Sequence, residues 1–174
     1  MNALTLSNTN ARRIFLDRHH LSETPQGPAS GIELLNLIKT LGFVQLDSIN
    51  TVARAHDLIL FSRRPRYRPK ALKSLYEDDR ALFEHWTHDA AVIPMEYYPQ
   101  WHMRRHRDAE RLKSRWRADR REGFEAQFQT IIDQIREHGP VSSSDVGKGE
   151  ARGSGGWWDW HPSKTALEYL WRSG

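Results

Sequence analysis

The stretch GFVQLDSINTVARAHDLILFSR, residues 42–63, decides how the chain is interpreted. Its first part, FVQLDSI at 43–49, alternates apolar and polar residues, which is the pattern of a short, half-buried strand. Residues two apart on a strand point the same way, so Gln45 and Asp47 should face one cleft while Leu46 faces the core. Residues 51–62 follow and predict a helix.

A carboxylate and an amide that lie side by side can hold a water molecule between them. The carboxylate of Asp47 can accept a proton from this water and stabilise a developing cation. The amide of Gln45 offers both a donor and an acceptor, so it can orient the water. The alternative is an ordinary exposed strand face that carries two polar residues, and the spacing alone favours that alternative.

Helices are expected on the N-terminal side of this stretch. Residues 8–20 predict a first helix, and TPQGP at 24–28 breaks the chain. Ser30 can cap the next helix and Gly42 can end it. Apolar residues recur along this helix with helical spacing, namely Leu34, Leu35, Leu37, Ile38 and Leu41.

The C-terminal side of the stretch predicts a short helix and a hairpin. The helix covers residues 70–78. ALFEHW (81–86) and AAVIPM (90–95) predict two strands around a tight turn near Thr87–Asp89. Two or three helices, one strand and a wing-like hairpin together favour a winged helix-turn-helix.

A second unit is expected after a long charged helix at 99–122. Its first helix begins near Phe124, and Gly139-Pro140 ends it. A further helix is expected from Ser142 or Ser143, then a loop, GKGEARGSGG at 147–156, and a final helix from Pro162. One face of the first helix is apolar and carries Phe124, Phe128, Ile131, Ile132 and Ile135.

The predicted fold class is mainly α with short β hairpins (α+β), built as tandem winged helix-turn-helix units. We expect the first unit at 1–98, a charged connecting helix at 99–123 and the start of a second unit at 124–174. We expect this second unit to be incomplete, because the strands of its wing are missing.

Composition restricts the classes of protein that the chain can belong to. The chain has 174 residues and no cysteine, which excludes disulfides, zinc ribbons and thiol catalysis. No apolar run approaches the ~20 residues of a membrane span, and the start does not resemble a secretory signal. The net charge of +4 and the isoelectric point of about 9.6 favour an anionic partner, of which nucleic acid is the commonest.

The clearest basic cluster follows the deciding stretch. No acidic residue interrupts it before Glu77, and Tyr67 within it could pack against a sugar or a base. The alternative is a solvated loop. The cluster contains Arg63, Arg64, Arg66, Arg68, Lys70 and Lys73.

The other candidates for chemistry are weaker. The arginines of 99–122 are spaced for intrahelical pairs with acids, so a solvated helix face is at least as well supported as a phosphate track. His102 and His106 have ligand-capable spacing, but arginines lie between them, and His85 and His88 lack an obvious third ligand, so no metal site is predicted. WWDW at 157–160 favours packing over base stacking.

The deciding stretch resembles the N-terminal catalytic segment of the AlkZ/AlkX (YcaQ-like) winged-helix DNA glycosylases. That family carries a Gln, an apolar residue and then Gln or Asp, and Gln45-Leu46-Asp47 looks like the version of the YcaQ-like branch. The resemblance continues through LFEHWTHDAAVIPMEYY (82–98) and HPSKTALEYLWRSG (161–174), so it extends from about residue 11 over nearly all of the chain.

The resemblance implies tandem winged helices around a DNA channel. It also implies hydrolysis of the N-glycosidic bond of alkylated purines, above all N7-alkylguanine, with unhooking of interstrand crosslinks in the YcaQ-like branch. Asp47 matches the catalytic carboxylate and Gln45 the water-positioning amide, with no metal or organic cofactor. The motif has no lysine nucleophile, so a monofunctional hydrolase is expected.

The expected partner is double-stranded DNA that contains alkylated purines. We expect a monomer without membrane contact in the bacterial cytoplasm, associated with the nucleoid. The alternatives are a winged-helix DNA-binding protein without catalysis and an inactive, truncated member of the family. The residues predicted to bind DNA are Arg54, His56, Arg63, Arg64, Arg66, Arg68, Lys70 and His88.

Overall fold

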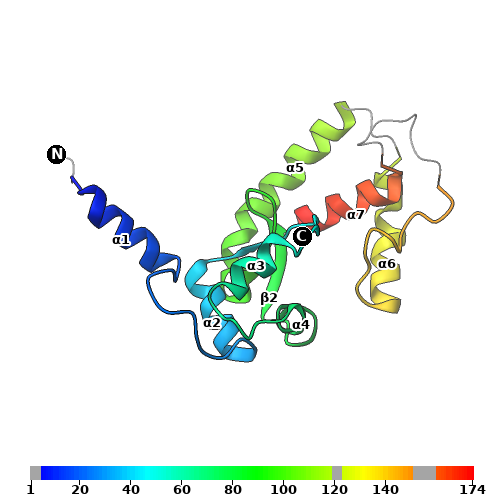
Figure 1. Cartoon of the computed structure of the whole chain (residues 1–174). Coiled ribbons are helices and arrows are strands. Elements are labelled where there is room, and N and C mark those ends of the chain that lie inside the picture. The colour runs from blue at the N-terminus through cyan, green and yellow to red at the C-terminus, as the bar shows by residue number, and fades with distance from the viewer. Residues whose placement is uncertain (1–4, 119–122, 151–159) are drawn as a thin grey trace. The chain divides into compact units, whose positions relative to one another are not determined.

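The computed structural model describes residues 5–118, 123–150 and 160–174 (Figure 1). The chain divides into two compact units, Met1–Pro99 and Gln100–Gly174. The predicted mixture of helices with a small antiparallel sheet is confirmed. The first unit holds that three-stranded sheet, whereas the described part of the second unit is helical.

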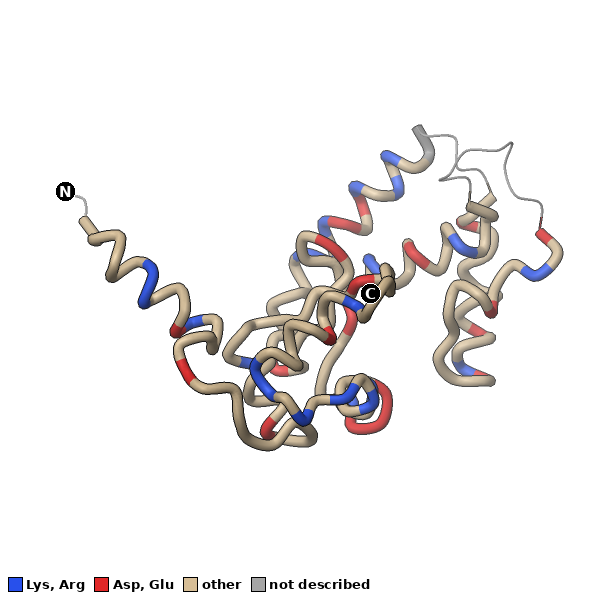
Figure 2. The backbone as a smooth tube through the Cα atoms, in the orientation of Figure 1, with Lys and Arg blue, Asp and Glu red and all other residues tan. Residues whose placement is uncertain are grey.

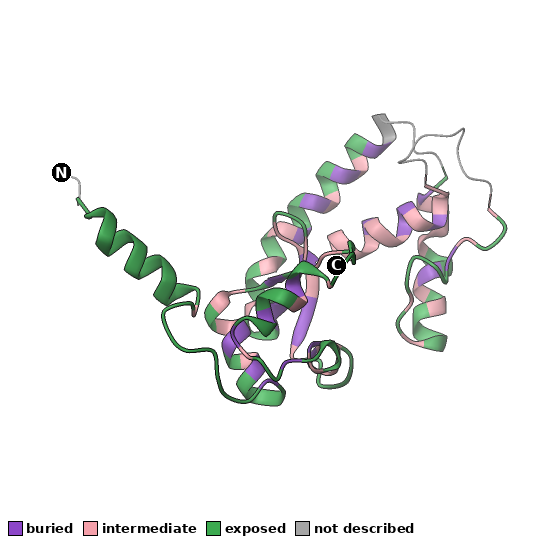
Figure 3. Cartoon of the chain, viewed as in Figure 1, coloured by how far each residue is buried: buried purple, intermediate pink, exposed green. Residues whose placement is uncertain are grey.

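From residue 5 onward, where the first unit is described, it contains four α-helices and a π-helical turn. They are α1 (Asn8–Arg18), α2 (Gly31–Leu41), α3 (Ala55–Phe61), α4 (Pro69–Lys73) and the π-helical turn Ser74–Asp78. The predicted end of α2 is confirmed, because Gly42 has a φ of 90° and its N–H bonds to the carbonyl oxygen of Ile38 at 2.8 Å. No residue of α1 is buried, as its uniform green in Figure 3 shows.

The sheet consists of β1 (Val44–Gln45), β2 (Leu82–Trp86) and β3 (Ala90–Pro94), in the order β1-β3-β2. Both pairings are antiparallel, with Val44 opposite Val92 and Glu84 opposite Val92 on the other side. The predicted hairpin is confirmed: the N–H of Thr87 bonds to the carbonyl oxygen of Asp89 at 2.8 Å and closes its turn.

An aliphatic core joins one face of this sheet to the helices behind it. The sheet contributes Val44, Leu82 and Val92, each at most 3% exposed. The apolar stripe predicted for α2 packs against them, with Leu34 and Ile38 fully buried. Burial of a leucine or isoleucine side chain contributes about 1.5–3 kcal/mol, so α2 holds the sheet, and thus β1, in place.

The described part of the second unit contains three α-helices, and its core is largely aromatic. They are α5 (His102–Ala118), α6 (Phe128–His138) and α7 (Pro162–Ser173). Trp116 packs edge-on against Phe124 with 5.8 Å between ring centroids, and Phe128 stacks on Tyr169 at 4.9 Å. The Tyr169 hydroxyl donates to the carbonyl oxygen of Ala109 at 3.1 Å, so α5 packs on α7 within this unit.

Several predicted elements differ from the structure. The helix predicted from 51 begins at Ala55, and the helix predicted at 70–78 becomes π-helical after Lys73. The charged helix begins at His102 because Pro99 lies in a preceding 3₁₀ segment, Met95–Trp101. The helix predicted from Ser142 or Ser143 is wrong: the Asp145 carboxylate accepts hydrogen bonds from the backbone N–H and the hydroxyl of Ser142, which closes a turn.

The predictions for the loop after 150 and for WWDW fall largely outside the described residues. Of the WWDW segment only Trp160 is described, and the Lys164 ammonium lies 4.3 Å from the centroid of its ring. None of the described helices has the length and apolar character needed to cross a membrane.

Candidate active site

Gln45 and Leu46 occupy opposite sides of the end of β1, as the alternating pattern predicts. Val44 is 3% exposed and Leu46 packs against the same aliphatic core, whereas the side chain of Gln45 is exposed. The Leu46 N–H still bonds to the carbonyl oxygen of Ala90 at 2.8 Å. The strand predicted to continue to residue 49 therefore ends here, because the next N–H turns away from the sheet.

Asp47 is held at two points. Its backbone N–H donates to Nδ1 of His56 at 2.9 Å, and its Oδ1 accepts a hydrogen bond from the N–H of Ile49 at 2.8 Å. The second contact is an Asx turn, which reverses the chain locally. The helix α3 begins after it, at Ala55. Asp47 is only partly buried, so its carboxylate is accessible at the end of β1.

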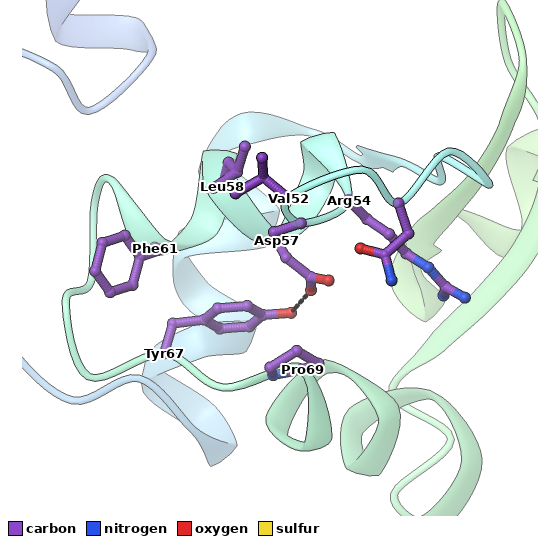
Figure 4. Close-up of a pocket in the computed structure, with 9 residues that line it drawn as sticks. Val52, Arg54, Asp57, Leu58, Phe61, Tyr67 and Pro69 are labelled. Carbon is purple, nitrogen blue, oxygen red and sulfur yellow. Dashed lines mark hydrogen bonds between the residues drawn. The ribbon is translucent and has the colours of Figure 1, made fainter.

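Two buried side chains, His56 and Tyr67, lie on either side of the partly exposed carboxylate of Asp57. His56 is 5% exposed, and its Nε2 lies 3.9 Å from Oδ1 of Asp57. The hydroxyl of Tyr67, a residue that is 2% exposed, donates to the same Asp57 oxygen at 2.7 Å (Figure 4). Tyr67 was predicted to pack against a sugar or base; that prediction is wrong, because its ring belongs to the core.

Burial shifts the pKa values of His56 and Tyr67. It lowers the pKa of His56 below 6.5, while Asp57 opposes the shift, so the imidazole favours its neutral form. Burial also raises the pKa of Tyr67, and its hydrogen bond to Asp57 adds to this effect. The neutral phenol therefore remains a donor to the Asp57 carboxylate.

An open hollow of about 510 Å³ is lined by Asp57 and Tyr67. Figure 4 shows the Asp57–Tyr67 hydrogen bond, with the apolar side chains of Leu58, Phe61 and Pro69 around it. Arg54 and Asn50 also line the hollow. The hollow therefore combines apolar walls with one carboxylate and one guanidinium. In the sequence, its lining residues follow the loop that carries Asp47.

The basic residues after α3 are not equivalent. Arg66, Arg68 and Lys70 are exposed, and Figure 2 shows Lys and Arg along this loop and on α4. Arg63 is only 8% exposed, and its guanidinium donates to the carbonyl oxygens of His19 and Ile59 at 2.9 Å. Its role in this structure is to tie the end of α1 to α3.

The remaining predicted DNA-binding residues also differ in exposure. Arg54 is exposed at the residue before α3, and His88 is exposed in the β2–β3 turn. Arg64 is half-buried, and its guanidinium donates to the carbonyl oxygen of Arg63 at 3.1 Å. The burial of His56 argues against direct contact with DNA for this residue.

On α5 the basic side chains surround an acid. Asp108 is 2% exposed and lies 3.2 Å from the guanidinium of Arg111 and 3.7 Å from that of Arg104. Arg104 and Arg111 therefore pair with a buried acid of their own helix. Within the described ranges, no group of three or more His, Asp or Glu side chains lies close enough to hold a metal ion.

Sequence reasoning missed Asp57 and the structural use of Tyr67. Asp57 follows His56 in the first turn of α3, where it looks like an ordinary N-terminal acid. Tyr67 lies inside an Arg-rich loop, and the residues of such a loop are expected to be exposed to solvent. The available signal was the tyrosine itself, since a bulky aromatic among arginines commonly anchors a loop to the core.

The family comparison agrees with the resemblance. Residues 38–174 match the family model described as DNA glycosylase AlkZ-like, and this range includes β1, Asp47, His56 and the basic loop. No solved structure matches the chain.

Proposed function

Because the chain belongs to the AlkZ-like DNA glycosylase family, we propose that it hydrolyses the N-glycosidic bond of alkylated purines in duplex DNA. N7-alkylguanine is the proposed class of lesion. Asp47 is the proposed catalytic carboxylate and Gln45 the proposed water-positioning amide. Family membership supports the general glycosylase role, and the geometry at the end of β1 supports the choice of residues.

The proposed reaction needs no strong acid. An N7-alkylguanine carries a positive charge, so the bond between C1′ and N9 breaks with its electron pair moving to the base, which leaves neutral. The sugar becomes oxocarbenium-like, as in glycoside hydrolysis, and a nearby carboxylate stabilises that charge. Water held by Gln45 adds to C1′, and Asp47 accepts its proton. The products are a free base and an abasic site.

One observation carries this proposal: the accessible Asp47 carboxylate is fixed through both its own backbone and its side chain. The Asp47 N–H is bound to His56, and its Oδ1 is bound to the N–H of Ile49. An ordinary exposed strand carboxylate needs neither contact. Such restraint is what a catalytic group requires, because misplacement by about 1 Å can lower a rate by about 100-fold.

We propose further that the first unit is a winged helix. The order α2-β1-α3-α4-β2-β3 supports this, with β1 added to the β2–β3 hairpin and the turn at His88 as the wing. In helix-turn-helix proteins the second helix of the motif enters the major groove. Here that helix is α4, which carries Lys70 and Lys73. Arg54, Arg66 and Arg68 are the other proposed phosphate contacts.

The same helix order favours a second candidate function, a winged-helix module that binds DNA without catalysis. In that case Gln45 and Asp47 are structural, and the basic residues carry the function. Such a module would prefer particular DNA sequences. A glycosylase should instead be indifferent to sequence and prefer alkylated duplex.

The test is single-turnover incubation of the chain with a duplex that contains one N7-methylguanine. We expect free N7-methylguanine and an abasic strand, with no covalent adduct on borohydride treatment, since the proposed nucleophile is water. An undamaged duplex of the same sequence is the control. Equal binding to both duplexes and weaker binding to a third duplex of scrambled sequence, all without base release, would reject the glycosylase and support the binding module.

A further inference from the structure

His56 lies between the backbone of Asp47 and the carboxylate of Asp57 in the first unit. It is the second residue of α3 and is 5% exposed. One ring nitrogen, Nδ1, lies 2.9 Å from the backbone nitrogen of Asp47, and the other, Nε2, lies 3.9 Å from Oδ1 of Asp57. The imidazole therefore lies between the loop that bears Asp47 and the hydrogen-bonded pair Asp57–Tyr67.

The donor at Asp47 fixes the tautomer of this imidazole. A backbone N–H can only donate, so Nδ1 must present a lone pair. A neutral ring then carries its proton on Nε2, the nitrogen that faces Asp57. Asp57 is itself held by the hydroxyl of Tyr67 at 2.7 Å. The result is an ordered sequence of contacts from the core to the Asp47 backbone.

We propose that His56 is a positioning residue for Asp47: its neutral imidazole, protonated on Nε2, holds the Asp47 amide and thereby fixes the direction of the carboxylate. The catalytic consequence rests on the proposed function of Asp47. The contact itself does not, because it can be measured in a protein that excises nothing. His56 is thus assigned a role behind the site and not on the DNA.

Neutrality is essential to this role. Protonation of Nδ1 removes the only lone pair that the Asp47 amide can use, and it adds a cation beside the place where an oxocarbenium ion would form. Burial lowers the pKa of His56 and so keeps the ring neutral. Among its charged neighbours, Asp57 and Asp47 favour the protonated ring, and Arg54 disfavours it.

The competing role is a direct DNA contact, as expected for a histidine beside a basic loop. The neighbouring Arg54 is exposed, whereas His56 is buried with both ring nitrogens directed at protein atoms. The two roles predict different effects of replacing His56. Loss of a DNA contact weakens DNA binding, whereas loss of a positioning residue lowers the rate of base release by the bound complex and leaves DNA binding unchanged.

The test compares His56→Leu, which keeps bulk but removes the acceptor, with His56→Asn, which retains an acceptor near the position of Nδ1. His138→Leu is the matched control, since His138 is an exposed histidine at the end of α6 in the second unit. Hydrogen exchange of the Asp47 amide is measured by nuclear magnetic resonance. We expect its protection to be lost in His56→Leu and kept in His56→Asn and His138→Leu.

The same amide in the unchanged chain provides a test that needs no variant. As the pH is lowered and His56 is protonated, the Asp47 amide resonance should shift together with the His56 ring resonances. If the His56 ring titrates while the Asp47 amide keeps its shift and its exchange rate, the proposal is overturned.

Base release measures the catalytic consequence. We expect the single-turnover rate on alkylated duplex to fall by about tenfold to 100-fold in His56→Leu. His56→Asn should recover most of it, and the Kd for DNA should stay within about twofold in both. A parallel loss of affinity with normal Asp47 protection would instead identify a DNA contact. If the parent chain releases no base while its Asp47 amide behaves as expected, the proposed function fails and the positioning contact stands.

Discussion

The Asp47 corner and the basic loop that follows α3 are adjacent in sequence but are held in opposite ways. The Asp47 N–H is held by His56, and Nε2 of His56 faces the Asp57 carboxylate, which accepts a hydrogen bond from Tyr67. Arg66 and Lys70, by contrast, extend into solvent. Chemistry at one atom needs a fixed group, whereas phosphate contacts tolerate movement because charge acts over distance. The comparison predicts that substitutions will separate catalysis from binding.

Loss of Gln45 should produce the largest effect after loss of Asp47. Gln45→Ala leaves the sheet intact because the side chain is exposed, but it removes the group proposed to hold water. We expect the single-turnover rate of base release to fall by about 100-fold or more with unchanged DNA affinity. Gln129→Ala, at an exposed glutamine of α6, is the control. Equal rates in the two variants would remove Gln45 from the site.

The basic loop should show the reverse pattern. In Arg66→Gln/Lys70→Gln, two proposed phosphate contacts are lost, so the slope of log affinity against log salt should become shallower by about 2. Lys113→Gln/Arg136→Gln, with the same change of charge in the second unit, should alter it far less. The measurement is a fluorescence titration between ~50 and ~200 mM salt. If the rate of base release at saturation falls in Arg66→Gln/Lys70→Gln while the slope of log affinity against log salt is unchanged, the proposed separation of catalysis from phosphate binding is wrong.

Two tyrosines provide a matched pair for the buried network. Tyr67 donates to Asp57 at 2.7 Å, and Tyr76 donates to Glu84 at 3.1 Å within the sheet region. Replacement by Phe should cost about 1.5–3 kcal/mol of unfolding free energy in each case, because a carboxylate loses a donor. Only Tyr67→Phe should also slow base release, by a few-fold. Urea unfolding and single-turnover rates measure the two effects, and equal slowing by Tyr76→Phe would contradict the network.

The pH dependence of stability should report His56. Burial lowers the pKa of His56 in the folded chain below 6.5, its ordinary value. As the pH falls below 6.5, His56 therefore takes up a proton in the unfolded chain before it does so in the folded chain. The free energy of unfolding therefore drops as pH falls through 6.5, until the folded pKa is passed. His56→Asn should lack this part of the dependence. Identical slopes for parent and variant in urea unfolding between pH ~5 and ~7 would show that His56 does not contribute.

The sequence predicted the parts of the fold that periodicity specifies. The stripe of α2, its end at Gly42 and the β2–β3 hairpin all depend on local pattern and glycine chemistry, and all are confirmed. The end of β1 was not predictable in this way. Whether the Asp47 N–H continues the ladder or turns to His56 depends on a contact with a side chain nine residues further on.

The same limit applies to the site. Gln45 and Asp47 stand out because two polar residues flank an apolar one on a strand, and the catalytic role of both is still a prediction. Asp57 and Tyr67 do not stand out in the sequence, because they lie ten residues apart. Asp57 looks like an ordinary acid at the start of a helix, and Tyr67 looks like an aromatic residue in a loop. Exposure also separates Arg63 from Arg66, although both look alike in an arginine-rich run.

The most direct test of the account compares the parent with Asp47→Asn for release of N7-methylguanine from alkylated duplex, at saturating protein and with Kd measured in parallel. The variant keeps the backbone N–H that binds His56 and a side-chain oxygen for Ile49, so the fold should be preserved. The account predicts release by the parent, no measurable release by the variant, and equal DNA affinity. Equal release by both proteins would show that the carboxylate at the end of β1 is not the catalytic group.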